Sequence, residues 1–527
     1  MKCLNIEELT TEQKIGQLMV ARGYSHEGDR EFIFDLLKNK SLGGLQLPLS
    51  PNSAEEAELV NEAAGYPVLI CADMERGFPK SEYQIPSMLS LGIAGDEELA
   101  YQVGAVTAIE AKRHGYNTVW GPVVDLLAGN ANCKVPRCLG EDPEAVGRMA
   151  TAILKGYHDN GMVTTAKHWP CGLDVKEDSH IFSTVSELTE EELVKIVFAP
   201  YKYAMDKGEL TGIMTGHTIC ANVDDLYPGT LSEKLISIVR RQGFDGLIMT
   251  DSFAMIGIQQ KFGADKCPGL AVRAGNDMIL VDYRVPARES YEHLLRAYRE
   301  GVFSEERLND AVKHVLAAQQ RTLPRATASS VSAYQKECFD RIERESFCAV
   351  TDKDTSSALS KDGKKLFVVL VENVYASEDG ESLEISDSTA ITLKDYKTIK
   401  ETILSKFPNS EVDFMSQRPS GREVSHVCHA ATKADQVIFL TSVSSRAYRA
   451  SENLTEHIIT VMRSMKEKIS AVIHFGNPYA MERVPHVPRI LFSAGAVCKD
   501  RAVSYALDIL NGDYKPIGTL PIKLQLQ

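Results

Sequence analysis

The sequence has no long hydrophobic run and no leader-like start. No apolar stretch reaches the length of about 20 residues that a helix needs to cross a bilayer. The first residues, MKCLNIEELTTEQKIGQLM, lack the basic start and apolar core of a secretory signal peptide. We therefore expect a cytoplasmic protein with no membrane partner.

Paired cysteines and an excess of basic residues are missing as well. The 11 cysteines are odd in number and form no CxxC pair. Reduced thiols are therefore expected, rather than a disulfide framework or a zinc site. Lys and Arg number 58 against 72 Asp and Glu, which gives a net charge of -14. Because an acidic surface repels phosphates, we expect no nucleic-acid partner, and no cofactor is implied.

What remains is the composition of an ordinary globular protein, with 44% hydrophobic and 25% charged residues in a chain of 527. Eight apolar runs without period-two alternation are typical of parallel strands buried on both faces. They are Leu18–Ala21, Gly44–Leu47, Val68–Asp73, Thr118–Asp125, Met162–Lys167, Ile213–His217, Leu247–Asp251 and Met278–Val281. Helix-sized segments separate them, so we predict an α/β fold with a (β/α)8 TIM-type barrel.

A second domain is predicted after the barrel. Helices are expected at Ala287–Glu300 and Ser304–Gln320, followed by a linker rich in Pro, Ser, Thr and Ala around Pro324–Tyr334. Strands are then expected at Leu366–Asn373, Gln436–Val443, Ala471–Tyr479 and Arg489–Gly495, with a helix near Glu452–Ser464. We therefore predict a catalytic barrel at 1–323, a linker at 324–344 and a smaller α/β layered sandwich at 345–527.

Polar residues follow five of the predicted barrel strands. They are Asp73, Asp125, Lys167 with His168, His217 and Asp251. The carboxyl ends of barrel strands converge on one face, where the active site of this fold lies. One charged strand end usually only caps a turn, whereas five in one chain predict a site.

Asp251 lies in the segment DGLIMTDSFAM, residues 245–255. A buried strand delivers this carboxylate to the barrel mouth, where it can attack an anomeric carbon and form a covalent glycosyl-enzyme. The competing interpretation is an aspartate that caps the next helix, and this segment alone does not decide between the two.

Asp178 and His180 end the segment KHWPCGLDVKEDSH, residues 167–180. Alternate residues of an extended loop face the same side, so the carboxylate can fix the imidazole tautomer. The histidine could then donate and accept a proton near neutral pH. The competing interpretations are a polar surface loop and a metal site. A metal site would need third and fourth ligands at suitable spacing, and none is apparent.

Further segments extend the pattern over nearly the whole chain. They are TTEQKIGQLMV near the start, ADMERG (72–77), the stretches 117–147 and 228–255, AGNDMILV (274–281), GNPY (476–479) and PIGTLPIKL (516–524). This combination resembles glycoside hydrolase family 3. The resemblance implies a barrel with Asp251 as nucleophile, followed by the family's second domain.

The loop at residues 167–180 indicates a subgroup. Family members that are β-N-acetylglucosaminidases carry K-H-F-P-G-H-G-x4-D-S-H and use the Asp-His pair as acid/base. The spacing from Lys167 to His180 is the same and both ends match, so the resemblance implies that His180 is the acid/base and Asp178 orients it. Residues Pro170–Leu173 read PCGL where the family has PGHG. We expect this change to affect the sugar accepted more than the chemistry.

The resemblance also implies sugar contacts by Asp73, Arg137, Lys167 and His168. Asp125 and His217 either line the same pocket or orient other residues and pair inside the barrel. We expect a small N-acetylglucosamine-containing glycoside as substrate, hydrolysed by a retaining exo-β-N-acetylglucosaminidase through a glycosyl-Asp intermediate. The alternatives are another β-glycosidase of the family, a phosphorylase, or a non-catalytic sugar-binding protein. A phosphorylase is included because a neutral histidine repels phosphate less than a carboxylate does.

Overall fold

The computed structural model describes residues 1–129, 133–171, 173, 175, 177–323, 330–351, 358–360, 362–371, 375–376, 382–383, 391, 393–443, 445, 453–495 and 500–527. The chain divides into two compact units. The first, the barrel unit, comprises Met1–Gln84, Glu97–Leu126 and Glu141–Phe339. The second, the sandwich unit, comprises Ile85–Asp96, Leu127–Gly140 and Asp340–Gln527.

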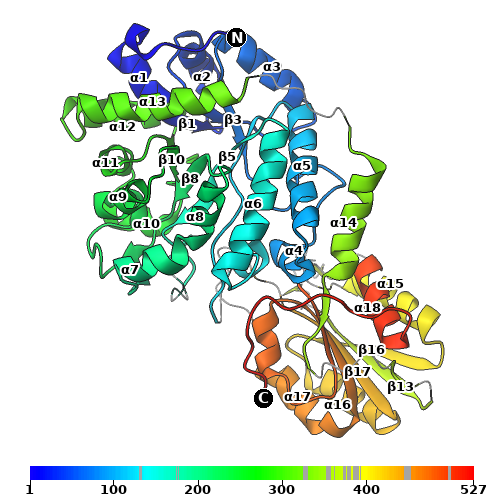
Figure 1. Ribbon diagram of the computed structural model, residues 1–527. Coiled ribbons are helices and arrows are strands. Elements are labelled where there is room, and N and C mark those ends of the chain that lie inside the picture. The colour runs from blue at the N-terminus through cyan, green and yellow to red at the C-terminus, as the bar shows by residue number, and fades with distance from the viewer. Residues whose placement is uncertain are drawn as a thin grey trace. The chain divides into compact units, whose positions relative to one another are not determined.

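Parallel strands form the barrel (Figure 1). Around the ring they are β1 (Met19–Arg22), β2 (Gly44–Gln46), β3 (Leu69–Ala72), β4 (Thr118–Val119), β5 and β6 (Val163–Thr164 and Ala166–Trp169), β8 (Gly212–Thr215), β10 (Leu247–Thr250) and β11 (Ile279–Leu280). Strand β11 pairs with β1, and a parallel bridge between Met249 and Met278 joins β10 to β11. All eight predicted strands lie at these positions, so the predicted (β/α)8 barrel is confirmed.

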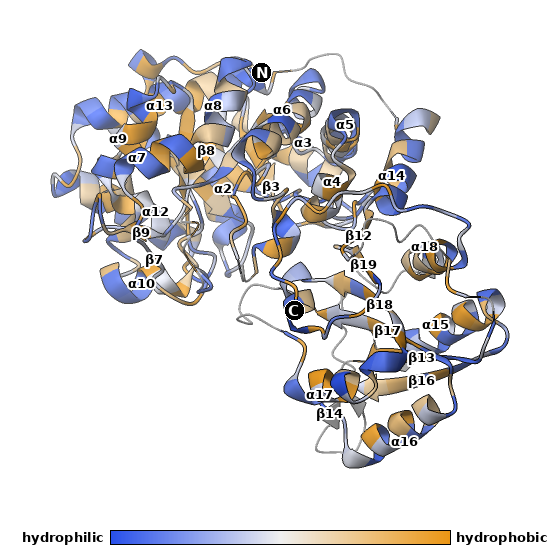
Figure 2. Cartoon of the chain, turned by 60° about the horizontal axis from the view of Figure 1, so that its bottom comes forward, coloured by the Kyte–Doolittle hydropathy of each residue, from blue (hydrophilic) through white to orange (hydrophobic). Residues whose placement is uncertain are grey.

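Helices surround the strands. They are η1 (Ile6–Glu8), α1 (Thr11–Gln17), α2 (Asp29–Lys38), α3 (Ser53–Ala64), α5 (Glu97–Arg113), α6 (Pro143–Asp159), α7 (Glu190–Glu192), η3 (Leu193–Val197), α8 (Ala199–Asp206), η4 (Gly229–Leu231), α9 (Glu233–Arg241), α10 (Ile256–Phe262), α11 (Cys267–Ala274), α12 (Ala287–Arg299) and α13 (Glu305–Arg321). Figure 2 shows hydrophilic and hydrophobic residues alternating along them, as expected for helices with one face on the strands. A short parallel pair, β7 (Val185–Ser186) and β9 (Ile219–Cys220), lies in loops that follow β6 and β8.

Local sequence signals explain where several helices begin. The Asp142 side chain accepts a hydrogen bond from the Ala145 backbone N–H (2.8 Å), and Pro143 takes the first helical position of α6. Ser304 caps α13 in the same way, by accepting from the Arg307 N–H (3.1 Å). These caps satisfy backbone donors that have no partner within the helix.

A buried ion network closes the amino end of the barrel strands. Asp277, which precedes β11, is fully buried. It accepts from Arg240 Nη2 (2.9 Å), Arg307 Nη2 (2.5 Å) and His314 Nδ1 (3.1 Å). Its second oxygen also accepts from the Ile248 N–H (2.9 Å). Helix α13, which carries Arg307 and His314, is therefore fixed at this end of the barrel.

A six-stranded sheet forms the centre of the sandwich unit, in the order β12-β19-β18-β17-β13-β16. The strands are β12 (Phe347–Ala349), β13 (Lys365–Val371), β16 (Ser410–Ser416), β17 (Gln436–Val443), β18 (Ile469–Gly476) and β19 (Ile490–Ser493). All pairs are parallel except the one between β12 and β19. The predicted layered α/β fold is therefore confirmed, with two edge strands, β12 and β16, added to the predicted four.

Helices pack against this sheet, α15 and α18 on one face and α16 and α17 on the other (Figure 1). The remaining elements of the unit are α4 (Met88–Ala94), η2 (Val135–Arg137), β14 (Tyr375–Ala376), β15 (Ser382–Leu383), α15 (Leu393–Lys406), α16 (Gly421–Thr432), α17 (Glu456–Ser464), η5 (Lys466–Lys468), η6 (Pro478–Arg483) and α18 (Asp500–Asn511). Helix α14 (Ala333–Glu345) lies largely within the predicted linker. The predicted domain boundaries stay a prediction. Within the described part of the chain, no helix has the length and apolar character needed to span a membrane.

Candidate active site

Asp251 directly follows β10, at the carboxyl end of the barrel strands. Its backbone N–H donates to the Thr215 carbonyl (2.9 Å), which ties it to the end of β8. Its Oδ1 accepts from the Ser252 N–H (2.7 Å), and 20% of the side chain is exposed. The carboxylate is therefore fixed by the backbone and still accessible.

Positive and polarisable groups surround this carboxylate. Burial by itself raises the pKa of Asp251, but His168, His217 and Lys167 outweigh it and hold the pKa below the usual range. Of these, His168 places its Nε2 3.7 Å from Asp251 Oδ2. The carboxylate is consequently anionic at neutral pH, as a nucleophile must be.

Asp125 fixes the orientation of His168. Its Oδ2 accepts from His168 Nδ1 (2.8 Å) and its Oδ1 accepts from the His168 backbone N–H (2.6 Å). Asp125 is buried, so water competes little for these bonds. The arrangement turns Nε2 of His168 towards Asp251.

Lys167 connects the strand end of β6 to that of β3. Its Nζ contacts Asp73 Oδ1 (2.6 Å) and Glu75 Oε1 (2.9 Å). The lysine side chain is 3% exposed, whereas that of Asp73 is 57% exposed. Lys167 thus orients Asp73 while leaving it accessible to a ligand. Glu75 lies within the segment ADMERG and was not predicted to belong to the site.

His217 is buried and has partners on both ring nitrogens. Nε2 donates to the Ser252 carbonyl (3.1 Å), and Nδ1 lies 2.8 Å from Thr230 Oγ1. Burial lowers the pKa of His217. The Thr230 hydroxyl in turn donates to the Gly216 carbonyl (2.8 Å). The ring also stacks on Phe253 (5.9 Å between centres). His217 therefore holds the segment after Asp251, and its predicted sugar contact stays a prediction.

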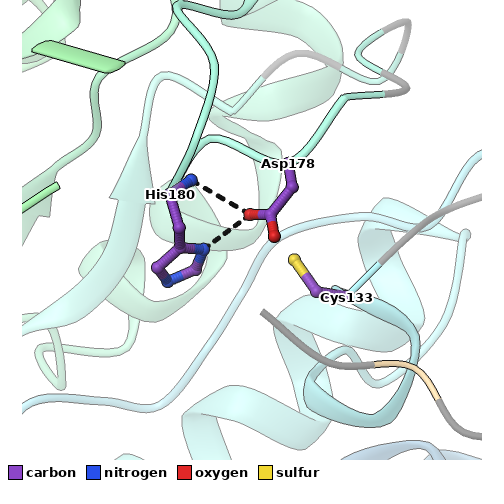
Figure 3. Close-up of side chains that lie close together, drawn as sticks. All are labelled: Cys133, Asp178 and His180. Atoms are coloured by element: carbon purple, nitrogen blue, oxygen red, sulfur yellow. Dashed lines mark hydrogen bonds and ion pairs between the residues drawn. The ribbon is translucent and has the colours of Figure 1, made fainter. Parts of the chain in front are cut away.

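Asp178 and His180 form the predicted pair (Figure 3). Asp178 Oδ1 accepts from the His180 backbone N–H (3.0 Å) and from Nδ1 (2.7 Å). Asp178 is 1% exposed and His180 is 21% exposed. The carboxylate therefore fixes the tautomer that places the hydrogen on Nδ1.

Two observations relate this pair to Asp251. The His180 carbonyl accepts from the N–H of Ile256 (3.1 Å), the first residue of α10, shortly after Asp251. The charge of His180 also acts with that of His168 to lower the pKa of His217. The altered loop itself is described only in part, since Gly172 lies outside the described residues.

Arg137 is the one predicted site residue that belongs to the other unit. It ends η2 within the segment Leu127–Gly140 of the sandwich unit and is half-buried. Its predicted contact with a sugar stays a prediction. The other predicted residues all belong to the barrel unit.

A group of potential metal ligands also lies in the barrel unit. Ligand atoms of Asp277, Asp310 and His314 lie within 4.8 Å of one another. Both carboxylates already pair with Arg307, and Asp277 also pairs with Arg240. Because arginine cations already neutralise these carboxylates, we assign them to stability and not to a metal.

Comparison with known proteins defines the class. The family model described as "Glycosyl hydrolase family 3 N terminal domain" matches residues 10–318. The chain belongs to glycosyl hydrolase family 3, and the predicted family is confirmed.

Particular relatives are more specific. A beta-hexosaminidase of Tolumonas auensis is 31% identical over 259 residues, which cover 47% of this chain and 77% of that protein. A beta-N-acetylglucosaminidase/beta-glucosidase of Cellulomonas fimi is 26% identical over 334 residues, or 59% of this chain and 58% of that protein. The chain thus spans less than two thirds of the Cellulomonas protein.

Solved structures extend the likeness to both units. The family 3 beta-N-acetylglucosaminidase from Paenibacillus sp. str. FPU-7 superposes with a TM-score of 0.77 at 26% identity, covering 98% of this chain and all of that chain. A beta-glucoside phosphorylase superposes with a TM-score of 0.79 at 22% identity, covering 98% and 94%. At that identity the second likeness shows the fold alone.

Proposed function

We propose that the protein is a retaining exo-β-N-acetylglucosaminidase that removes terminal β-linked N-acetylhexosamine. The observation that carries the proposal is the hydrogen bond between His180 Nδ1 and Asp178 Oδ1 (2.7 Å). The loop that carries this pair is bonded to the segment after Asp251 through the His180 carbonyl and the Ile256 N–H. The names of the Tolumonas and Paenibacillus relatives support the same substrate class. A cytoplasmic location is part of the proposal, supported by the ten described cysteines, which form no disulfide.

The proposed reaction has two displacements. Asp251 attacks the anomeric carbon while His180, as imidazolium, protonates the departing oxygen. Neutral His180 then takes a proton from water, which attacks the same carbon and releases Asp251 with retained configuration. Asp178 keeps the imidazole in position throughout.

The terminal sugar is held by hydroxyl contacts in this proposal. Asp73, oriented by Lys167, accepts from sugar hydroxyls, and Lys167 and His168 donate to them. Arg137 and His217 complete the proposed set. The types fit because neighbouring hydroxyls both donate to carboxylates and accept from cationic donors.

One observation keeps a phosphorylase as the second candidate. The acid/base is an imidazole, which is neutral in the second step, when a carboxylate would be anionic and repel phosphate. Phosphate in place of water would release a sugar 1-phosphate. A β-glucosidase is the further alternative, and the name of the Cellulomonas relative includes it.

One experiment separates these candidates. Aryl β-N-acetylglucosaminide and aryl β-glucoside are incubated with wild type, Asp251→Asn and Asp225→Asn, each with and without phosphate. Asp225 is an exposed loop residue and serves as the control for charge loss. We expect turnover of the acetamido sugar by wild type and the control, and a loss of more than about 1000-fold in Asp251→Asn, because the nucleophile is removed.

The other outcomes are equally informative. A phosphate-dependent rate with sugar 1-phosphate as product would identify a phosphorylase, and preference for the glucoside would identify a β-glucosidase. Trapping with a slow fluoro-sugar followed by peptide mapping checks the nucleophile. A label on any residue other than Asp251 would contradict the assignment.

A further inference from the structure

Arg22 lies beside the nucleophile and has no part in the mechanism described above. It is the last residue of β1 and half-buried. Its Nε donates to Gln46 Oε1 (2.8 Å) at the end of β2, and its Nη1 donates to Ser252 Oγ. The guanidinium carbon lies 5.0 Å from the centre of the Tyr283 ring, just after β11. Three strand ends and the residue after Asp251 therefore fix its position.

The guanidinium lacks an ionic partner in contact. No carboxylate of the described residues lies within 4 Å of it, and its protein partners are an amide, a hydroxyl and an aromatic ring. Burial lowers the pKa of Arg22, and the charges of Asp73 and Asp251 act in the opposite direction. A guanidinium has five N–H donors, and the bonds to Gln46 and Ser252 use two of them. Arg22 is only half-buried and none of its nitrogens is among the buried, unpartnered side-chain atoms of the described residues, so the remaining donors are accessible to a ligand.

We infer that Arg22 binds the terminal sugar and donates to one of its oxygens. Asp73 and Asp251 are proposed to contact the same sugar ring, and the charge of Arg22 interacts with both. Arg22 also contacts Ser252, the residue directly after Asp251, and this contact places its guanidinium beside the proposed site of attack. The acceptor is a neutral sugar oxygen, because Asp73 and Asp251 would repel an anionic substituent. This inference rests on the proposed glycosidase function.

A positioning role is the rival explanation. Arg22 contacts Ser252, whose N–H donates to Asp251 and whose Oγ also accepts from the Ala254 N–H (3.1 Å). Loss of Arg22 could thus displace the nucleophile without any lost contact to sugar. Lower activity of a variant does not separate the two roles, but the dependence on individual sugar oxygens does.

The test pairs enzyme variants with altered substrates. Wild type, Arg22→Met and Arg22→Lys are compared on an aryl β-N-acetylglucosaminide and on its 3-, 4- and 6-deoxy and N-deacylated analogues. Arg30→Met is the matched control, since Arg30 is exposed on α2 and paired with Glu56. Thermal melting checks that each variant folds. Arg22→Lys keeps a donor and a charge, so it covers the case in which Arg22→Met does not fold.

We expect one analogue to identify the acceptor. Removal of that oxygen lowers kcat/KM of wild type and Arg30→Met by about 10-fold or more, as for a hydrogen bond to a charged group. The same removal lowers kcat/KM of Arg22→Met by less than about 3-fold, because the bond is already lost. Arg22→Lys lies between them.

Two results would overturn the inference. In one, removal of each oxygen lowers kcat/KM of Arg22→Met by the same factor as kcat/KM of wild type, which assigns Arg22 to positioning through Ser252. Where Arg22→Met does not fold, Arg22→Lys is compared with wild type in its place. In the other, both Arg22 variants match wild type on all substrates. If wild type hydrolyses none of the parent glycosides, the proposed function itself fails, and the inference fails with it.

Discussion

Asp178→Asn tests how much His180, the proposed acid/base, depends on its carboxylate partner. Asp178 is almost fully buried and its Oδ1 accepts two bonds from His180, one of them from the ring at 2.7 Å. A hydrogen bond to a charged group contributes about 1.5–3 kcal/mol, and each 1.36 kcal/mol is about tenfold in rate. We therefore expect kcat/KM to fall by about 10- to 150-fold.

The loss should depend on the leaving group, because His180 is proposed to protonate the departing oxygen. Aryl β-N-acetylglucosaminides with leaving groups of graded acidity are assayed with wild type and Asp178→Asn. Poor leaving groups need the acid most, so the loss should be largest for them and small for the most acidic phenols. Glu177→Gln is the control, since Glu177 is the exposed neighbour and loses the same charge.

Two results would refute this reasoning. If Glu177→Gln and Asp178→Asn lose activity equally, a general change of charge in the loop explains the effect. If Asp178→Asn loses the same factor for every leaving group, the pair does not deliver a proton in the first step. Unchanged melting of the variant is required before either result is interpreted.

Two further predictions concern stability. Asp277→Asn should destabilise the barrel by about 3 kcal/mol, because it removes the buried anion that pairs with both Arg240 and Arg307, while Asp245→Asn, at a 99% exposed side chain, should change little. Urea unfolding followed by tryptophan fluorescence measures this, since both tryptophans, Trp120 and Trp169, belong to the barrel unit, and equal midpoints would contradict the prediction. In the sandwich unit, burial lowers the pKa of His474 to about 4, below its value in the unfolded chain. The folded protein therefore holds this histidine neutral, and the contribution to stability is fully present above about pH 6.5 and is lost as the pH falls towards 4. The free energy of unfolding should fall by roughly 2 kcal/mol at about pH 5. Hydrogen exchange of β17 and β18 in urea, compared at pH 7 and pH 5, should show this loss in wild type but not in His474→Leu. The same acid sensitivity in the variant would assign the loss to other groups.

The barrel was predictable because of how its strands are buried. A parallel strand covered on both faces is a continuous apolar run, and eight such runs marked the ring. The edge strands β12 and β16 were missed for the opposite reason. Phe347–Ala349 is only three residues long, and Ser410–Ser416 is largely polar, so neither resembles a buried strand.

The positions of the candidate site residues at strand ends were predictable, but the hydrogen-bond partners of these residues were not. Asp251, His168 and Lys167 each end or follow an apolar run, which the sequence shows directly. The partners that decide their roles lie far away along the chain: Asp125 is 43 residues from His168, and Ser252 is 35 from His217. Only folding brings these together.

Arg22 shows why one class of site residue is missed. A single arginine after a short apolar run has the pattern of a solvated strand end, and nothing nearby in the sequence indicates burial. Its environment comes from Gln46, Ser252 and Tyr283, at the ends of three other strands. Glu75 was not predicted as a site residue for a related reason, because a turn made of charged residues is usually exposed.

The charges around Asp251 have opposite effects on the two proposed steps. His168, His217 and Lys167 lower the pKa of its carboxyl group, and a less basic carboxylate is a weaker nucleophile. The same groups make it a better leaving group when water attacks the glycosyl-enzyme. The surroundings of Asp251 therefore favour the second step at the expense of the first. The proposed first step then depends on proton delivery to the departing oxygen, which is the role proposed for His180, and Asp178 holds that histidine in place.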